Sequence, residues 1–377
     1  MSACSRSLTS SRCDRRRLLL TRRLVVPLVA VIAVVLSSCN AANPPGSAGS
    51  ARATAPPTSG AVSQVFDSTS AGSSVPPNRP TAAAGYPITV QNCGFAVTVD
   101  HSPNRILAIK STSMELLLAL GLADRVVGAA FLDGPVPAQW RDAASSIPVI
   151  STGAPSNEPV LGLDPDLIIA GWESNLAPDT AGDRGRLAAA GIASYVSPAA
   201  CRGASQPKKL TFPMLFAEFE EVGRLLGVRE SATALVAAQQ RELAAVPKLD
   251  RRVTALWWSS GSDTPYVGGG IGAPEMVMNA VGLENIAAGI DQTWTSLGWE
   301  SIIGDDPDVI ILVDASWSSA SKKMHLLEQN PATARLTAVR EHHFVTIPFP
   351  ASEAGVRSVD AAKDIAHQLA ALGFGSR

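Results

Sequence analysis

The sequence has few histidines and lacks the familiar motifs of catalytic and metal-binding sites. It contains only five histidines in 377 residues, and neither His-Glu-x-x-His nor another familiar ligand spacing joins them. It lacks the Gly-x-Ser-x-Gly elbow of serine hydrolases, and no Lys-Ser/Thr pair follows the glycines at 268–272 to make a phosphate loop. We therefore expect a protein that is not an enzyme and that carries neither a cofactor nor a bare metal ion.

The N-terminal apolar run is too short to be a membrane anchor. It covers residues 24–36, and its 13 residues fall short of the roughly 20 that a membrane-spanning helix needs. Seven arginines and one acid, Asp14, precede this run, which ends at Leu36 and is followed by Ser37-Ser-Cys39. This order of basic, apolar and small residues predicts a secretory signal peptide at 1–38 that is removed.

Small residues directly before Cys39 match the lipobox of bacterial lipoproteins, in which the cysteine is lipidated and becomes the first mature residue. The alternative is an ordinary signal peptide with an incidental cysteine. Several acyl chains on one residue hold a protein firmly at a membrane. We expect an extracytoplasmic protein, anchored by lipid to the outer face of the cytoplasmic membrane.

The segment after Cys39 has little charge and little apolar bulk. Between residues 41 and 85 only Arg52, Asp67 and Arg79 are charged, and Ala, Gly, Ser, Thr and Pro dominate. Such a composition cannot bury enough apolar surface to fold. We interpret 39–85 as the lipidated cysteine and a flexible tether, which would reach on the order of 35 to 40 Å.

Acidic residues outnumber basic residues in the mature chain. Without the signal peptide, 24 basic residues remain against 32 acidic ones, a formal net charge of −8. A net negative charge argues against a nucleic-acid partner. No coiled-coil heptads occur, so we expect a monomer.

Only two cysteines remain in the region expected to fold. Cys4 and Cys13 leave with the signal peptide, and Cys39 is assigned to the lipid, so Cys93 and Cys201 are left. A disulfide between them suits an oxidising compartment, and two separate buried thiols are the alternative.

From residue 86 onward, short β-rich runs alternate with helical stretches. Strands are expected at 105–109, 125–128, 167–170 and 193–196, with helical patterns between them. This alternation predicts an α/β protein with parallel sheets. The length suits two Rossmann-like lobes, at 86–209 and 251–377, and the helical pattern at 210–250 predicts one or two long helices that join them.

One unit of the sequence occurs twice. Residues 158–169, Glu-Pro-Val-Leu-Gly-Leu-Asp-Pro-Asp-Leu-Ile-Ile, match residues 300–311, Glu-Ser-Ile-Ile-Gly-Asp-Asp-Pro-Asp-Val-Ile-Ile. In each copy a glutamate begins a short helix, a Pro-Asp turn ends it, and a buried strand follows. We expect the two copies to occupy equivalent places in the two lobes.

These segments resemble the substrate-binding proteins of bacterial ABC importers of the iron-siderophore and cobalamin type. The likeness includes 105–109 (Arg-Ile-Leu-Ala-Ile), 165–169 (Pro-Asp-Leu-Ile-Ile) and 281–285 (Val-Gly-Leu-Glu-Asn). It implies the class III periplasmic-binding fold, an ABC permease as partner, and docking of Glu158 and Glu300 onto that permease. Glutamates that merely suit a helix start are the alternative.

A narrower likeness is to actinobacterial proteins described as carriers of a phospholactyl deazaflavin, a precursor of coenzyme F-420. It lies in 92–94 (Asn-Cys-Gly), 131–135 (Phe-Leu-Asp-Gly-Pro), 171–175 (Gly-Trp-Glu-Ser-Asn) and 353–357 (Glu-Ala-Gly-Val-Arg). It implies a small conjugated ligand of deazaflavin type. A ferric siderophore, haem or cobalamin is the alternative, and a sensory or structural lipoprotein that does not transport is a second one.

Ligands of open α/β lobes lie beyond the carboxyl ends of the strands, which directs attention to the residues after each strand. Lys110 and the hydroxyls after it suit an anion at a helix start, and Arg202 and Arg357 suit a carboxylate or phosphate. Trp257 and Trp258 should face opposite sides of their strand, so that one of them could reach the cleft. The expected ligand-binding residues are Lys110, Ser111, Thr112, Trp172, Glu173, Asn175, Arg202, Trp258, Tyr266, Trp294, Trp317 and Arg357.

Overall fold

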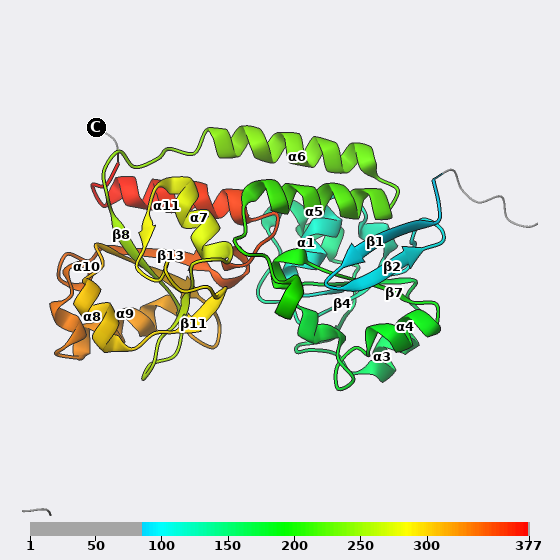
Figure 1. The fold of residues 1–377 in the computed structure, drawn as a ribbon, viewed down its shortest axis with the longest axis horizontal. Helices are drawn as coiled ribbons and strands as arrows, with labels where there is room; N and C mark the ends of the chain where they lie inside the picture. The colour runs from blue at the N-terminus through cyan, green and yellow to red at the C-terminus, as the bar shows by residue number, and fades with distance from the viewer. Residues whose placement is uncertain (1–84, 376–377) are drawn as a thin grey trace, which may run out of the picture. The chain divides into compact units, whose positions relative to one another are not determined.

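The computed structural model describes residues 85–375, and the predicted signal peptide, Cys39 and nearly all of the predicted tether lie outside this range. Two lobes, each built on a β-sheet, make up the described chain (Figure 1). None of the described helices is long and apolar enough to cross a membrane. Nor do the described residues contain a group of three or more His, Cys, Asp or Glu side chains that could hold a metal ion.

The first lobe contains a five-stranded, wholly parallel sheet in the order β5-β4-β3-β6-β7. Strands β3 and β6 are buried at every position, because helices and loops cover both faces of the sheet. The strands are β3 (Ile106–Ile109), β4 (Val126–Ala130), β5 (Val149–Ser151), β6 (Leu167–Ala170) and β7 (Ala193–Val196). The helices are α1 (Ser111–Ala119), α2 (Arg141–Ala144), α3 (Asn157–Gly162) and α4 (Arg184–Ala189).

An antiparallel hairpin precedes this sheet, which the sequence interpretation did not include. It consists of β1 (Ile88–Asn92) and β2 (Phe95–Val99), whose alternating burial is typical of a half-exposed ribbon. The Asn92 amide bonds both the backbone N–H and the carbonyl of Val196, at 2.8 Å each. The hairpin is thereby fixed to the edge strand β7.

The second sheet is mixed, which corrects the expectation of parallel sheets in both lobes. Strands β10, β8, β12 and β13 pair in parallel, but β9 and β11 run antiparallel at one edge. The strands are β8 (Thr254–Ser260), β9 (Tyr266–Gly268), β10 (Glu284–Asn285), β11 (Trp294–Ser296), β12 (Val309–Asp314) and β13 (Phe344–Pro348). The helices are α7 (Ala273–Val281), α8 (Trp299–Asp305), α9 (Ala320–Gln329), α10 (Thr337–Arg340) and α11 (Ser358–Ala371).

The repeated sequence unit folds the same way in both lobes. Helices α3 and α8 end before Asp164 and Asp306, which have left-handed φ values of 48° and 40° and precede a proline. The next aspartate of each unit then bonds the start of a neighbouring strand: Asp166 accepts from Arg105, and Asp308 accepts from Thr254. The short helix and the strand that follows it therefore occupy equivalent positions.

Two helices connect the lobes, α5 (Phe212–Leu225) and α6 (Arg229–Ala244), and they lie side by side at the top of Figure 1. Gly227, at φ +70°, makes the turn between them. Gly223 allows close packing, because a Cβ there would lie 2.3 Å from that of Ala232. Helix α6 starts near the first lobe and reaches the second, where Glu242 pairs with Lys363 of α11.

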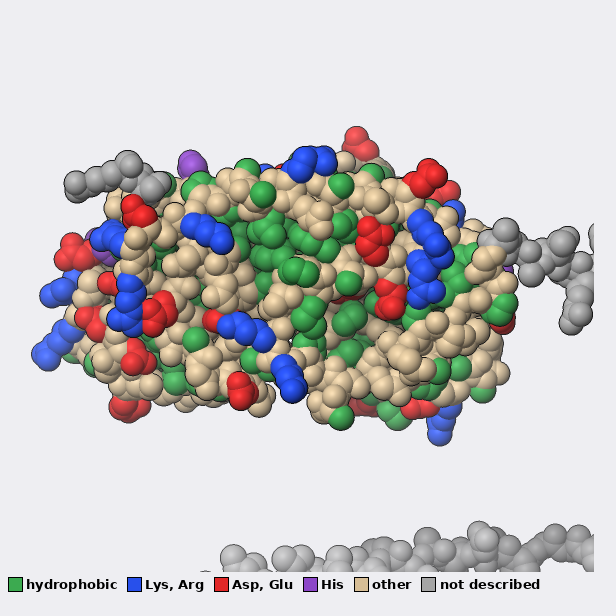
Figure 2. Space-filling model, turned by 45° about the horizontal axis from the view of Figure 1, so that its top comes forward, with side chains coloured by type: hydrophobic (Ala, Val, Ile, Leu, Met, Phe, Trp, Pro, Cys, Tyr) green, Lys and Arg blue, Asp and Glu red, His purple; other side chains and the backbone are tan. Residues whose placement is uncertain are grey.

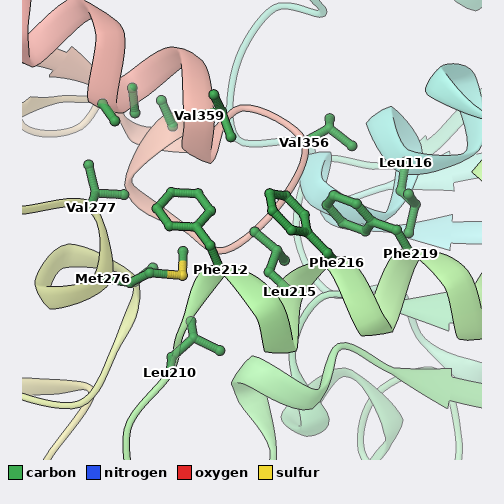
Figure 3. Close-up of a cluster of buried hydrophobic side chains, with 14 of the residues drawn as sticks. Leu116, Leu210, Phe212, Leu215, Phe216, Phe219, Met276, Val277, Val356 and Val359 are labelled. Carbon is green, nitrogen blue, oxygen red and sulfur yellow. The ribbon is translucent and has the colours of Figure 1, made fainter. Parts of the chain in front are cut away.

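One apolar core continues from lobe to lobe through α5. Phe216 and Phe219 of this helix belong to one buried cluster with Leu116 of the first lobe and Val356 and Val359 of the second (Figure 3). Moving the lobes apart would expose this cluster to water, which costs about 25 cal/mol for each Å² of apolar surface. The cleft between the lobes is therefore largely preformed.

A second concavity lies between α5, α6 and α7. Its floor is apolar and includes Phe212, Phe216, Val236, Leu243 and Met276. Apolar side chains gather in the middle of the face that Figure 2 turns forward, with charged residues around them.

Candidate ligand-binding cleft

The cleft between the lobes is lined mainly by residues at or after the carboxyl ends of strands in both sheets, and also by Tyr266 and Trp294 at the starts of β9 and β11. It encloses about 680 Å³, a size suited to a small organic molecule. The polar and aromatic side chains that line it are Thr112, Trp172, Ser197, Arg202, Gln206, Ser259, Ser260, Tyr266, Gln292, Thr293, Trp294, Trp317, Phe349 and Glu353.

Aromatic side chains form much of the cleft wall. Tyr266 stacks on Trp294 with their ring centroids 6.0 Å apart, and Trp317 meets Phe349 edge to face at 4.9 Å. Trp172 adds a ring from the first lobe. Tyr266 is 41% exposed and Trp317 is 57% exposed, so both present apolar area that a bound ligand would cover. Such walls suit a flat, conjugated ligand.

Lys110 lies beneath the cleft rather than in it, which corrects its assignment as a ligand-binding cation. The side chain is fully buried and forms an ion pair with Asp133, and its Nζ lies 3.5 Å from the ring centroid of Trp172. Its φ of 84° is rare for a residue with a side chain. Because Asp133 already neutralises this ammonium, Lys110 supports Trp172 and is not available to an anionic ligand.

The start of α1 already holds an anion of the protein itself. The carboxylate of Asp133 accepts a hydrogen bond from the Ser111 backbone N–H at 3.3 Å, and the Ser111 hydroxyl accepts one from the Asp133 N–H at 2.8 Å. Ser111 is therefore buried structure, a second correction, whereas Thr112 lines the cleft as expected.

Glu173 and Asn175 shape the loop after β6 and do not line the cleft, a further correction. Asn175 is buried and accepts from the Trp172 backbone N–H at 3.1 Å. Glu173 accepts from the Arg202 backbone N–H at 2.7 Å. Both side chains therefore position residues that face the ligand.

Arg202 is the cation that lines the cleft. Its backbone is fixed on two sides, by Glu173 and by the adjacent disulfide, which joins Cys201 to Cys93 in the hairpin turn. Among the described residues its guanidinium forms no ion pair. Burial raises the pKa of Tyr266, and the charge of Arg202 opposes that shift, so the two side chains lie within electrostatic reach.

Arg357 joins the two lobes and does not line the cleft, which corrects its assignment as well. Its guanidinium grips the buried carboxylate of Glu115 with two nitrogens, Nε at 2.7 Å and Nη2, and Nη2 also donates to the Pro135 carbonyl at 3.0 Å. Burial raises the pKa of Glu115, and Arg357 opposes the shift. The pair is therefore a polar tie across the interlobe seam.

Trp258 belongs to the core, so its expected place in the cleft is also wrong. Trp257 and Trp258 do face opposite sides of β8, but both are at most 1% exposed because both faces of the sheet are covered. The Trp258 Nε1 donates to the Ser260 carbonyl at 2.7 Å. The following serines, Ser259 and Ser260, reach the cleft instead.

The glycines at 268–272 serve the fold and not the ligand. A Cβ at Gly269 would lie 2.2 Å from the Gln292 carbonyl oxygen, and one at Gly270 would lie 2.1 Å from that of Ala288. They allow the 288–293 backbone to approach closely, and that segment carries Gln292 and Thr293 to the cleft.

Glu353 is a cleft residue that the sequence interpretation did not assign. It follows the short turn after β13, and its Oε1 accepts from the Trp172 Nε1 of the other lobe at 2.8 Å. Burial raises its pKa to about 7, against the opposing charge of Lys110. The position of Glu353 after a strand was a usable signal, but only tertiary contacts distinguish it from Arg357 four residues later.

The two predicted docking glutamates are exposed on equivalent helices. Glu158 lies in the first turn of α3 and Glu300 in that of α8, and Figure 1 shows one of these helices in each lobe. A shallow depression surrounds Glu158 and also contains Asp179 and the exposed side chain of Leu161.

Two α/β lobes that share one core and a preformed aromatic cleft define a solute-binding protein of the class III periplasmic-binding fold. The family model described as periplasmic binding protein matches residues 106–351, and the chain belongs to that family. The family consists of non-enzymatic, extracytoplasmic proteins that bind small ligands and work with the permeases of ABC importers.

Similar proteins and a solved structure support the assignment of the chain to this family. A cobalamin-binding protein of Halobacterium salinarum is 28% identical over 69% of this chain and 70% of its own length. An uncharacterized ABC transporter substrate-binding lipoprotein of Bacillus subtilis is 22% identical over 75% of this chain and 86% of its own. The solved structure of an ABC-type Fe3+-hydroxamate transport system from Saccharomonospora viridis is 26% identical, with TM-score 0.65, over 75% of this chain and 99% of that one.

Proposed function

We propose that this protein captures a flat, conjugated organic ligand in the interlobe cleft and delivers it to an ABC importer, and that the ligand is a deazaflavin of the coenzyme F-420 precursor type. The observation that carries the proposal is the pairing of stacked aromatic walls with one uncommitted cation, Arg202. Aromatic walls suit a tricyclic ring, and a guanidinium suits the phosphate of its side chain.

A metal-chelate ligand is the second candidate, and the cobalamin-binding relatives and the hydroxamate-type structure favour it. Haem suits the cleft less well. Its iron takes His, Cys, Met or Tyr as axial ligand, and of these side chains only Tyr266 is free among the described lining residues, since Cys201 is in the disulfide.

Titration of the mature protein with coenzyme F-420 should quench the tryptophan fluorescence of the protein, because Trp172, Trp294 and Trp317 line the cleft. Parallel titrations with cyanocobalamin, haemin and a ferric hydroxamate separate the two candidates. A response to one of these chelates together with none to the deazaflavin would overturn the proposed ligand and leave the transport class intact.

Glu158 and Glu300 are proposed to dock onto the permease, one from each lobe. Each would pair with a basic residue at an exposed interface, where a salt bridge contributes about 0 to 1 kcal/mol. The proposed lipid on Cys39 and the tether would add to this weak docking, because they keep the carrier near its membrane partner and raise its local concentration.

Replacing both docking glutamates, in Glu158→Ala/Glu300→Ala, should reduce uptake of the ligand by roughly tenfold while ligand affinity stays unchanged. Glu230→Ala is the matched control, because Glu230 also lies exposed in the first turn of a helix, α6. Unchanged uptake in cells that depend on this protein for the ligand would refute the docking proposal.

A further inference from the structure

We infer that Glu353 accepts a hydrogen bond from an N–H or O–H group on the ligand's ring, while Arg202 binds the ligand's anionic group. The cleft would thus select conjugated ligands that carry a donor at their buried end and an anion at their exposed end. This inference rests on the proposed function and makes it more specific.

One carboxylate oxygen of Glu353 accepts no hydrogen bond from the described residues. Oε1 accepts from Trp172, but Oε2 accepts no hydrogen bond within the described chain, and its nearest cation, the Lys110 Nζ, is 3.9 Å away. That ammonium donates to Asp133 instead. Glu353 is 9% exposed and lines the cleft. Oε2 keeps access to the cleft, and a bound ligand would separate it from solvent, so a donor on the ligand is needed to complete the site.

The charges around the cleft limit where an anion can bind. Lys110 and Arg357, two further cations close to the cleft, are neutralised by Asp133 and Glu115. Arg202 is exposed, whereas Glu353 is buried. A ligand anion therefore meets a cation at the rim and a carboxylate at the floor, which fixes the orientation of the ligand.

A deazaflavin meets both requirements, because its ring imide offers an N–H donor and its phosphate-bearing side chain extends from the opposite side of the ring. Haem meets only one, because its ring nitrogens bind the metal and leave no N–H group, although its carboxylates could reach Arg202. The free acceptor of Glu353 thus favours a deazaflavin over haem.

The pH dependence of binding follows from the groups that face Glu353. The groups near its carboxylate are Lys110 from the β3–α1 turn, Asp133 from the loop after β4, and the indole N–H of Trp172 after β6. Ser358 of α11 donates its hydroxyl to the backbone carbonyl of Glu353 and does not contact the carboxylate. A ligand donor stabilises the ionised carboxylate and lowers its pKa from about 7. Affinity should therefore rise between pH 6 and pH 7 and level off above it.

The test compares coenzyme F-420 with an analogue methylated at the ring imide nitrogen. Wild-type protein should bind the methylated analogue about 10 to 100 times more weakly, the cost of leaving a buried charged acceptor unpaired. Glu353→Gln should weaken binding of F-420 by a similar factor, because its amide nitrogen would face the imide N–H. The variant should not weaken binding of the methylated analogue further, and its pH profile should be flat.

Glu230→Gln, on the exposed face of α6, is the matched control and should bind both probes like the wild type. Equal binding of the two probes by wild-type protein would overturn the role of Glu353 while the proposed ligand stands, and this comparison holds even if Glu353→Gln does not fold. If wild-type protein binds neither probe, the proposed ligand fails and the inference fails with it.

Discussion

Arg357→Ala should lower the free energy of unfolding by about 3 to 5 kcal/mol, because it leaves the Glu115 carboxylate buried without its partner. The Glu115 side chain is 2% exposed and that of Arg357 is 15% exposed, so water cannot replace the lost contacts. The two residues belong to different lobes, and the cost should therefore appear as loss of the whole fold. Urea denaturation of the mature protein at pH 7 measures it.

Two controls separate the buried pair from a general effect of losing an arginine. Arg252→Ala removes an exposed pair with Glu284 and should leave stability nearly unchanged. The double variant Glu115→Leu/Arg357→Met removes both charges and should recover most of the loss, because apolar replacements of a buried pair are often tolerated. Equal stability of Arg357→Ala and Arg252→Ala would contradict a structural role for this interlobe tie.

Removing the disulfide in Cys93→Ser/Cys201→Ser should have an effect of similar size. The bond links residues 108 positions apart, for which the chain-entropy model gives about 4 to 5 kcal/mol of stabilisation. The change should also weaken binding of anionic ligands, because Arg202 would lose one of the two fixed points of its loop.

Denaturation with and without a reducing agent measures this contribution. The reductant should destabilise the wild-type protein as much as the double substitution does, and it should not affect the variant further. A difference below about 1 kcal/mol between oxidised and reduced wild-type protein would show that the loop is held by other contacts, such as those between Asn92 and Val196.

Most of the aromatic part of the cleft could be predicted from sequence, whereas of its charged part only Arg202 was predicted and Glu353 was missed. Tyr266, Trp294 and Trp317 were expected because aromatic residues are concentrated in the second half of the chain and suit a flat ligand, and all three line the cleft. Lys110 and Arg357 were expected from their positions after strands, yet each is neutralised by an acid more than 20 residues away along the chain. Sequence shows where a charge is, but not which other charge it meets.

The fold was largely determined by local patterns in the sequence. Apolar runs that begin directly after Pro-Asp turns indicated β6 and β12, and the repetition of this unit predicted two equivalent lobes. These signals are local because strand burial and helix termination depend on neighbouring residues. The antiparallel edge formed by β9 and β11 was missed, because three-residue strands carry too little pattern to identify.

By itself, the sequence determined the α/β class, the repeated unit and the aromatic character of the cleft, because each depends on composition or on spacing along the chain. Only the tertiary structure showed that Lys110 and Arg357 form internal ion pairs. It also showed that Arg202 and Glu353 line the cleft. The physical reason is that a charge is satisfied by whatever group the fold brings within a few ångströms, and that group is usually remote in the chain.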